Sequence, residues 1–161
     1  MNSISYVLLI ALAIALVFAA FTDMRRRQID NWLNLGIAIG APVFWWSSGL
    51  SLWPDVAIQF GVALAAFAVF AGLFALRMMG GGDVKLLTVL ALWVSPQAFM
   101  QLLLVMALAG GALTIVMVAW HTIRRQKGKL AIPYGVAIAF GGLWVLAVNY
   151  LPDGAFAVPA A

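Results

Sequence analysis

Six apolar stretches divide this sequence, and they constrain its fold more than any other feature. A helix needs about 20 apolar residues to cross a bilayer, and the stretches lie at 4–22, 32–53, 55–76, 84–95, 98–120 and 132–151. The chain is 66% hydrophobic and 9% charged, whereas a soluble domain has about 25% charged residues. The sequence therefore predicts an all-α integral membrane protein, with six transmembrane helices in one domain over residues 1–161.

The basic residues predict the orientation of these helices. All nine lie near alternate connections: Arg25–Arg27 after the first stretch, Arg77 and Lys85 around the third connection, and Arg124, Arg125, Lys127 and Lys129 after the fifth. Because cytoplasmic loops carry an excess of Lys and Arg, these connections are expected in the cytoplasm and both termini outside. The first stretch has no basic residue before it and three arginines after it, which is typical of a signal anchor rather than a cleaved leader.

Tryptophans and glycines indicate how the helices meet lipid and one another. Four tryptophans near the ends of the stretches are expected in an interfacial aromatic belt: Trp32, Trp53, Trp93 and Trp120. Small residues let helices approach closely, so three glycine pairs are predicted to be packing contacts: Gly36 with Gly40, Gly110 with Gly111, and Gly141 with Gly142.

Acid–base candidates are few. The sequence has no cysteine and no glutamate, so its five aspartates are the only side-chain carboxylates. Asp23 ends the first stretch and Asp83 opens the fourth, both toward the predicted cytoplasmic side, whereas Asp55 and Asp153 fall toward the other side. Asp30 lies in the basic loop after Asp23. With a single histidine, His121, no metal site is expected. Neither is an organic cofactor, and the basic residues are explained by topology rather than by a nucleic-acid partner.

Asp83 is expected below the membrane surface. If Pro96 marks the outer turn, Asp83 lies 13 residues inward, which is about 20 Å along a helix, whereas the hydrocarbon core is about 30 Å thick. Either the helix is tilted in a thinned membrane, or Asp83 lines a wet cavity. The triple glycine at 80–82 is expected to be non-helical backbone beside such a cavity.

Two neighbouring carboxylates suit peptide hydrolysis. Two negative charges held close together repel each other, so one carboxylate tends to stay protonated while the other is ionised. The ionised carboxylate can deprotonate a water, and the protonated one can polarise the scissile carbonyl. The sequence does not distinguish which aspartate takes which role. Each carboxylate also has a simpler interpretation, because an aspartate at a helix end is often just solvated, and one in a first turn is stabilised by the helix dipole.

Three segments together resemble the prepilin peptidase family of GxGD intramembrane aspartyl proteases. They are "GGGDVKLL" from Gly80, "DMRRRQIDN" from Asp23, and "AIPYGVAIAFGG" from Ala131. The resemblance implies that Asp23 and Asp83 are catalytic, and that substrate-binding or structural motif positions fall on Gly80, Gly82, Lys85, Asn31, Pro133, Tyr134 and Gly135. Asp30 stands where the family usually has proline, so Asp30 is an alternative to Asp23 as the upstream catalytic aspartate.

The resemblance also implies a function. The chain looks most like compact members of the TadV/CpaA type, which cleave the leader of type IV (Flp-like) prepilins or pseudopilins at the cytoplasmic face of the bacterial inner membrane. Its partners would be the prepilin substrate and the lipid bilayer, and methylation of the new N-terminus is not expected. Two other functions stay open: a small proton- or cation-coupled transporter component, and a non-catalytic membrane subunit of a pilus or secretion assembly.

Overall fold

The described residues form a bundle of six α-helices. The computed structural model describes residues 2–124 and 132–151, and no strand occurs among them. The helices are α1 (Ser3–Arg26), α2 (Asn31–Ser48), α3 (Ala57–Ala75), α4 (Gly81–Ala91), α5 (Pro96–Ile123) and α6 (Tyr134–Tyr150), with a short π-helical turn, η1 (Leu52–Val56), leading into α3. The predicted all-α architecture of six helices is confirmed.

Two helices end earlier than their apolar stretches. Helix α2 stops at Ser48 because Gly49 adopts a left-handed conformation, with φ of 72°, which is a common helix ending. Helix α4 stops at Ala91, and the Ser95 side chain then accepts a hydrogen bond from the backbone N–H of Ala98 to cap α5. Both endings shorten apolar stretches that were predicted to continue to residues 53 and 95.

The triple glycine is largely helical, contrary to the prediction. Gly80 is the N-cap of α4, and Gly81 and Gly82 lie in its first turn. The side chain of Asp83 therefore projects from a helix start, and only Gly80 has the extended backbone expected of a loop, with ψ of 142°.

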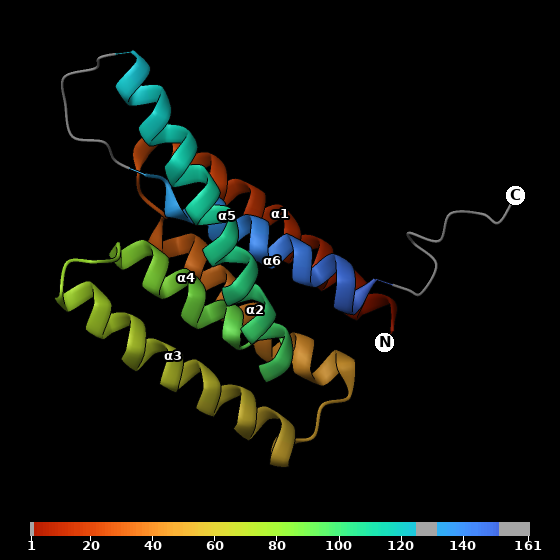
Figure 1. Ribbon diagram of the computed structural model, residues 1–161. Coiled ribbons are helices and arrows are strands. Elements are labelled where there is room, and N and C mark those ends of the chain that lie inside the picture. The colour runs from red at the N-terminus through yellow and green to blue at the C-terminus, as the bar shows by residue number, and fades with distance from the viewer. Residues whose placement is uncertain (1, 125–131, 152–161) are drawn as a thin grey trace, which may run out of the picture.

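Helix α4 is the shortest of the six described α-helices and forms the centre of the bundle. It packs against α2, α3, α5 and α6, while α6 also packs against α1 and α5 (Figure 1). The largest fully buried side chains include Leu86, Leu87 and Leu90 of α4, Leu16 of α1 and Leu102 of α5. Helix α3 lies at the edge of the bundle and α5 projects beyond it (Figure 1).

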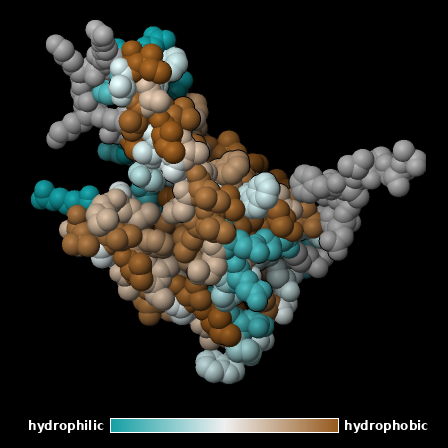
Figure 2. All heavy atoms as spheres, in the orientation of Figure 1, coloured by the Kyte–Doolittle hydropathy of each residue, from teal (hydrophilic) through white to brown (hydrophobic). Residues whose placement is uncertain are grey.

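The outer surface is that of a membrane protein. Within the described part of the chain, three helical segments are long and apolar enough to cross a bilayer, Ser3–Arg26, Leu52–Ala75 and Pro96–Ile123, and α6 is a shorter apolar helix. Large hydrophobic side chains stay exposed along them, including Ile14 at 65%, Leu64 at 61% and Leu108 at 68%. Hydrophobic residues cover much of the face seen in Figure 2. That all six helices cross the membrane, with both termini outside, stays a prediction.

Trp93 does not belong to an aromatic belt. It is only 3% exposed, its indole N–H donates to the backbone carbonyl of Ile37 at 2.8 Å, and its ring stacks on Phe44. Its position after the end of α4, in the turn that leads back to α5, directs it into the core. Trp32, Trp53 and Trp120 are more than half exposed, as the belt prediction requires.

The glycine pairs are packing contacts only in part. A methyl group at Gly40 would lie 2.7 Å from the Trp93 ring, and one at Gly141 would lie 2.9 Å from the backbone oxygen of Leu102. A methyl group at Gly36 or Gly111 would meet nothing within 4 Å. The prediction was therefore wrong for Gly36 and Gly111, because only one glycine of each of these pairs faces a neighbouring helix.

Candidate active site

One polar cavity brings the two aspartate motifs together. It has a volume of about 360 Å³ and lies where α1 ends and where α2 and α4 begin. We call it the aspartate cavity. Its lining residues are Asp23, Arg27, Gln28, Ile29, Asp30, Asn31, Gly80, Gly81, Gly82 and Asp83. The first motif and the glycine-rich motif, about 60 residues apart in sequence, thus both line one cavity.

Asp23 is held by the first turn of α6. It lies in the last turn of α1, is 7% exposed, and its Oδ2 accepts a hydrogen bond of 2.8 Å from the backbone N–H of Gly135. A Cβ at residue 135 would lie 2.9 Å from that same oxygen. Glycine is therefore required at this position, because any side chain would displace the carboxylate from the N–H that binds it.

Asp83 faces a similar arrangement at the start of α4. It is partly buried and precedes the apolar stretch of its helix. Burial and the negative charge of Asp23 together raise the pKa of Asp83 to about 6, although a hydrogen bond from the backbone of Gly80 opposes both effects. A Cβ at residue 80 would lie 2.9 Å from Oδ2 of Asp83. Each aspartate thus lies against a glycine backbone.

Lys85 and Asn31 join the two motifs at the rim of the cavity. The ammonium group of Lys85 donates a hydrogen bond of 2.8 Å to Oδ1 of Asn31. This contact joins the N-terminal part of α4 to the first turn of α2. Gly82 adds a close packing contact, because a Cβ there would lie 3.2 Å from Cβ of Ile29.

The third motif contributes Gly135 to the site, but its two preceding residues lie elsewhere. Pro133 is buried at the N-cap of α6. Tyr134 is 43% exposed and its ring lies beside Gly110 of α5. Neither residue lines the aspartate cavity. The first residue of this motif, Ala131, lies outside the described residues.

Of the two other described aspartates, Asp30 lines the aspartate cavity and Asp55 does not. Asp30 lines the aspartate cavity at the N-cap of α2, where its side chain makes no capping hydrogen bond. Asp55 lies before α3 and accepts hydrogen bonds from the backbone and hydroxyl of Ser51. Asp153 lies outside the described residues. Among the described residues, no group of three or more His, Cys, Asp or Glu is placed to hold a metal ion.

Arg27 and Gln28 also line the cavity, although the sequence indicated only a topology role for the arginines. Arg27 adopts a left-handed conformation, with φ of 55°, that ends α1 and turns the chain toward α2. Its backbone N–H donates to the carbonyl oxygen of Asp23 at 2.9 Å. The signal available in the sequence was its spacing, four residues after a carboxylate at a helix end.

Comparison with known proteins identifies the family. The model of the type IV leader peptidase family matches residues 10–115, which is well over half of the chain and includes both Asp23 and Asp83. The chain belongs to the type IV leader peptidase family. The predicted membership of the prepilin peptidase family is thereby confirmed.

Curated relatives carry the name prepilin leader peptidase/N-methyltransferase. Proteins of this name from two Burkholderia pseudomallei strains, 1026b and K96243, are each 28% identical over 141 residues, covering 81% of this chain and 43% of theirs. One from Pectobacterium carotovorum subsp. carotovorum is 34% identical over 71 residues, covering 44% of this chain and 24% of its own. This member of the family thus spans less than half the length of these relatives. No solved structure matches the chain.

Proposed function

We propose that the chain is an aspartyl endopeptidase that removes the leader from a type IV prepilin or pseudopilin, of the Flp-like class, at the cytoplasmic face of the inner membrane. One observation carries the proposal: two aspartates from separate motifs line one polar cavity at the end of an apolar helix bundle. Family membership and the names of the relatives support the same reaction.

The two carboxylates divide the acid–base work. Asp23 is buried, and the N–H of Gly135 offsets part of the cost of burying its charge, because hydrogen bonds to a carboxylate favour its ionised form. Burial and the charge of Asp23 raise the pKa of Asp83. The pair titrates as a unit, and we assign its shared proton to Asp83 at rest. Asp23 is then the general base and Asp83 the general acid.

Hydrolysis follows from this assignment. Asp23 takes a proton from a water molecule, and the water oxygen forms a bond to the scissile carbonyl carbon while Asp83 hydrogen-bonds the carbonyl oxygen. The C–N bond then breaks as Asp83 passes its proton to the leaving amine, and the proton that Asp23 took from the water becomes the shared proton of the pair. The products are the leader with a new carboxyl terminus and the pilin with a new amino terminus. General acid–base groups of this kind contribute about 10²–10⁴-fold to a rate.

Two substitutions test the assignment. Asp23→Asn and Asp83→Asn are each expected to lower prepilin cleavage at least about 100-fold, while the protein still inserts. Cleavage is measured as the gel shift of a prepilin incubated with each purified variant in lipid. Asp30→Asn is the matched control within the same cavity and is expected to retain activity. An inactive Asp30→Asn beside an active Asp23→Asn would transfer the upstream role to Asp30.

The two rival functions predict other outcomes. Proteoliposomes that contain only this chain and a prepilin separate the peptidase from a non-catalytic subunit, since the subunit would leave the prepilin intact. A transporter component would carry protons or cations across the same vesicles, and Asp83→Asn would stop that flux. The peptidase is expected to cleave the prepilin and to leave an imposed pH gradient unchanged.

A further inference from the structure

A groove beside the aspartate cavity is polar at one end and apolar at the other. It would therefore suit a substrate segment that changes from polar to apolar along its length. It lies between α2 and α3, with α4 as its floor, and has a volume of about 430 Å³. We call it the α2–α3 groove. At the end nearest the cavity it is lined by Asn31 and Lys85; farther along, by Leu35, Ala38 and Phe67. Asn31 lines both the groove and the aspartate cavity, so the two adjoin at this residue.

The residues change in character along the helix axis. Asn31 and Lys85 form the polar end, and Asn34 and Thr88 lie one turn farther along α2 and α4. Beyond them, Leu35 is 60% and Phe67 48% exposed. A chain that runs from the cavity into this groove would therefore leave polar surroundings within about two turns, or roughly 10 Å.

Asn34 is a buried acceptor with no partner. Its side chain is 4% exposed, and its Oδ1 has no hydrogen-bond partner among the described residues. Its amide nitrogen lies 3.5 Å from the backbone oxygen of Asp30. A buried polar atom left unpaired costs stability, so an acceptor here suggests that a ligand completes the pairing.

The start of a helix supplies suitable donors. The first four backbone N–H groups of a helix have no partner within the helix. If the apolar segment that follows the scissile bond binds as a helix, its first turn lies at the polar end of the groove, one turn from Asn31, at the level of Asn34. The rest of that helix would then contact Leu35, Ala38 and Phe67.

We propose that the α2–α3 groove binds the apolar helix downstream of the scissile bond, and that Oδ1 of Asn34 accepts a hydrogen bond from the first turn of that helix. This proposal rests on the proposed peptidase function and adds the position in which the substrate helix binds. Asn34 is a substrate-binding residue in this proposal, and it does not touch the reacting atoms.

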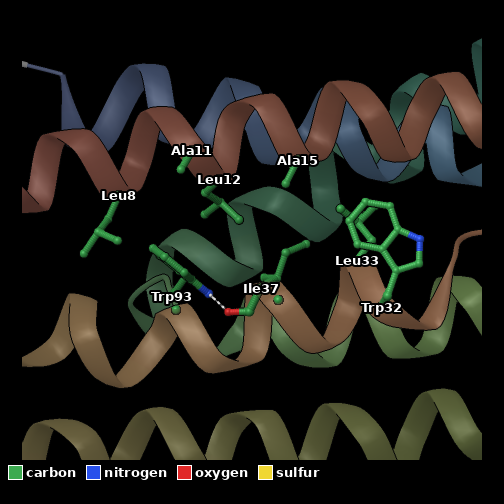
Figure 3. Close-up of a pocket in the computed structure, with 10 residues that line it drawn as sticks. Leu8, Ala11, Leu12, Ala15, Trp32, Leu33, Ile37 and Trp93 are labelled. Carbon is green, nitrogen blue, oxygen red and sulfur yellow. Dashed lines mark hydrogen bonds between the residues drawn. The ribbon is translucent and has the colours of Figure 1, made fainter.

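A second groove offers a rival position. The α1–α2 groove, of about 250 Å³, is lined by Leu8, Ala11 and Leu12 of α1 and by Leu33, Gly36 and Ile37 of α2, with Trp32 and Trp93 at its two ends (Figure 3). Figure 3 shows the side chains of α1 pointing toward α2 across it. Its walls are apolar throughout, and it shares no lining residue with the aspartate cavity. The α2–α3 groove is favoured for both reasons.

Kinetics with two substrates test the role of Asn34. One is a prepilin that the wild-type chain cleaves, and the other is a short peptide that ends a few residues after the scissile bond. Asn34→Leu is expected to raise KM for the prepilin about tenfold, to leave kcat near wild type, and to leave the short peptide unaffected. Gln59→Leu is the matched control, because Gln59 is also buried with an unpartnered oxygen but lies at the opposite end of α3. Equal losses on both substrates, or an unchanged KM, would overturn the role of Asn34.

Cross-linking tests the groove itself. The chain has no cysteine, so single cysteines can be placed at Ala38 or Phe67, and, for the rival groove, at Ala11 or Gly36. In an Asp83→Asn background, a cysteine in the substrate helix is expected to form a disulfide with residues 38 and 67 and not with residues 11 and 36. The reverse pattern, or no cross-link at any position, would overturn the proposal. Failure of wild type to cleave any prepilin would instead refute the proposed function.

Discussion

Two glycines place the two aspartates, one beside each. Gly135 donates its N–H to Asp23, and Gly80 lies against Asp83. In both cases a Cβ would lie 2.9 Å from a carboxylate oxygen. Backbone donors have little freedom to move, so they hold a carboxylate more firmly than a long side chain would. Both glycines therefore serve the site through close approach of the backbone rather than through flexibility.

Replacing Gly135 tests this role. In Gly135→Ala the new methyl group would displace Asp23 from the N–H of residue 135, and prepilin cleavage is expected to fall by about 100-fold, the cost of a misplacement near 1 Å. The measurement is the cleavage rate of the purified variant in lipid. Gly111→Ala is the control, because a Cβ there meets nothing within 4 Å. Wild-type rates in Gly135→Ala would show that the Gly135 contact is dispensable.

The charge of Asp23 should be measurable at Asp83. That charge raises the pKa of Asp83, in addition to burial. In Asp23→Asn the charge is lost and burial stays, so the pKa of Asp83 is expected to fall below about 6 while staying above the ordinary value for aspartate. The carboxyl ¹³C shift of Asp83, followed against pH in detergent, reports it. Asp30→Asn is the comparison, and a pKa of Asp83 that is equal in both variants would refute coupling between Asp23 and Asp83.

The sequence was informative about the aspartates for a physical reason. Both lie at ends of apolar stretches, and the distribution of basic residues assigns those ends to one side. The contact between Asp23 and Gly135 spans 112 residues and depends on how α1 packs on α6, so no local pattern predicts it. Asn34 was missed for the same reason: whether its side chain is buried depends on the rotation of α2 against its neighbours.

At the scale of whole helices, α6 packs closely on two neighbours through its glycines. A Cβ at Gly141 would lie 2.9 Å from the backbone oxygen of Leu102 and 3.2 Å from the backbone nitrogen of Met106. A Cβ at Gly142 would lie 2.8 Å from the side chain of Leu16. Because the first two neighbours are backbone atoms, α5 and α6 cannot accommodate a methyl group without moving apart.

Gly141→Ala is therefore expected to destabilise the bundle by about 1–3 kcal/mol, the usual cost of overpacking. Thermal unfolding in detergent, followed by circular dichroism, measures it as a lower Tm. Gly111→Ala, on the facing helix, is the matched control and is expected to keep or slightly raise Tm, since alanine favours helix over glycine. An unchanged Tm in Gly141→Ala would mean that the space between α5 and α6 can accommodate the added methyl group.

Helix number was predictable from sequence, and helix ends were less so. Apolar stretches report where lipid or core surrounds a helix, but the ends depend on caps such as Gly49 and Ser95, which interrupt apolar sequence. The triple glycine shows the converse. It was expected to be a loop because glycine weakens helices, yet Gly81 and Gly82 begin α4, where packing of Gly82 against Ile29 compensates.

Over the whole molecule, the basic residues gather at one end of the bundle. The α1–α2 and α3–α4 connections lie at the same end as the C-terminus of α5, and the N-terminus of α1 lies at the other (Figure 1). Arg25, Arg77 and Arg124 belong to the first of these ends. This arrangement agrees with the alternation of basic residues in the sequence, and it supports the proposal that the aspartate cavity opens toward the cytoplasm.

Labelling of single cysteines decides the orientation, because the chain has no cysteine of its own. Gln28 lines the aspartate cavity and is exposed, and Ser51 is exposed in the connection between α2 and α3. In intact spheroplasts, a membrane-impermeant maleimide is expected to label Ser51→Cys and to label Gln28→Cys only after lysis. Both variants should cleave prepilin if they fold, which controls for disruption. Labelling of Gln28→Cys before lysis would place the cavity on the outer side, where a prepilin leader that stays in the cytoplasm does not reach it, and the cytoplasmic site of cleavage would have to be abandoned.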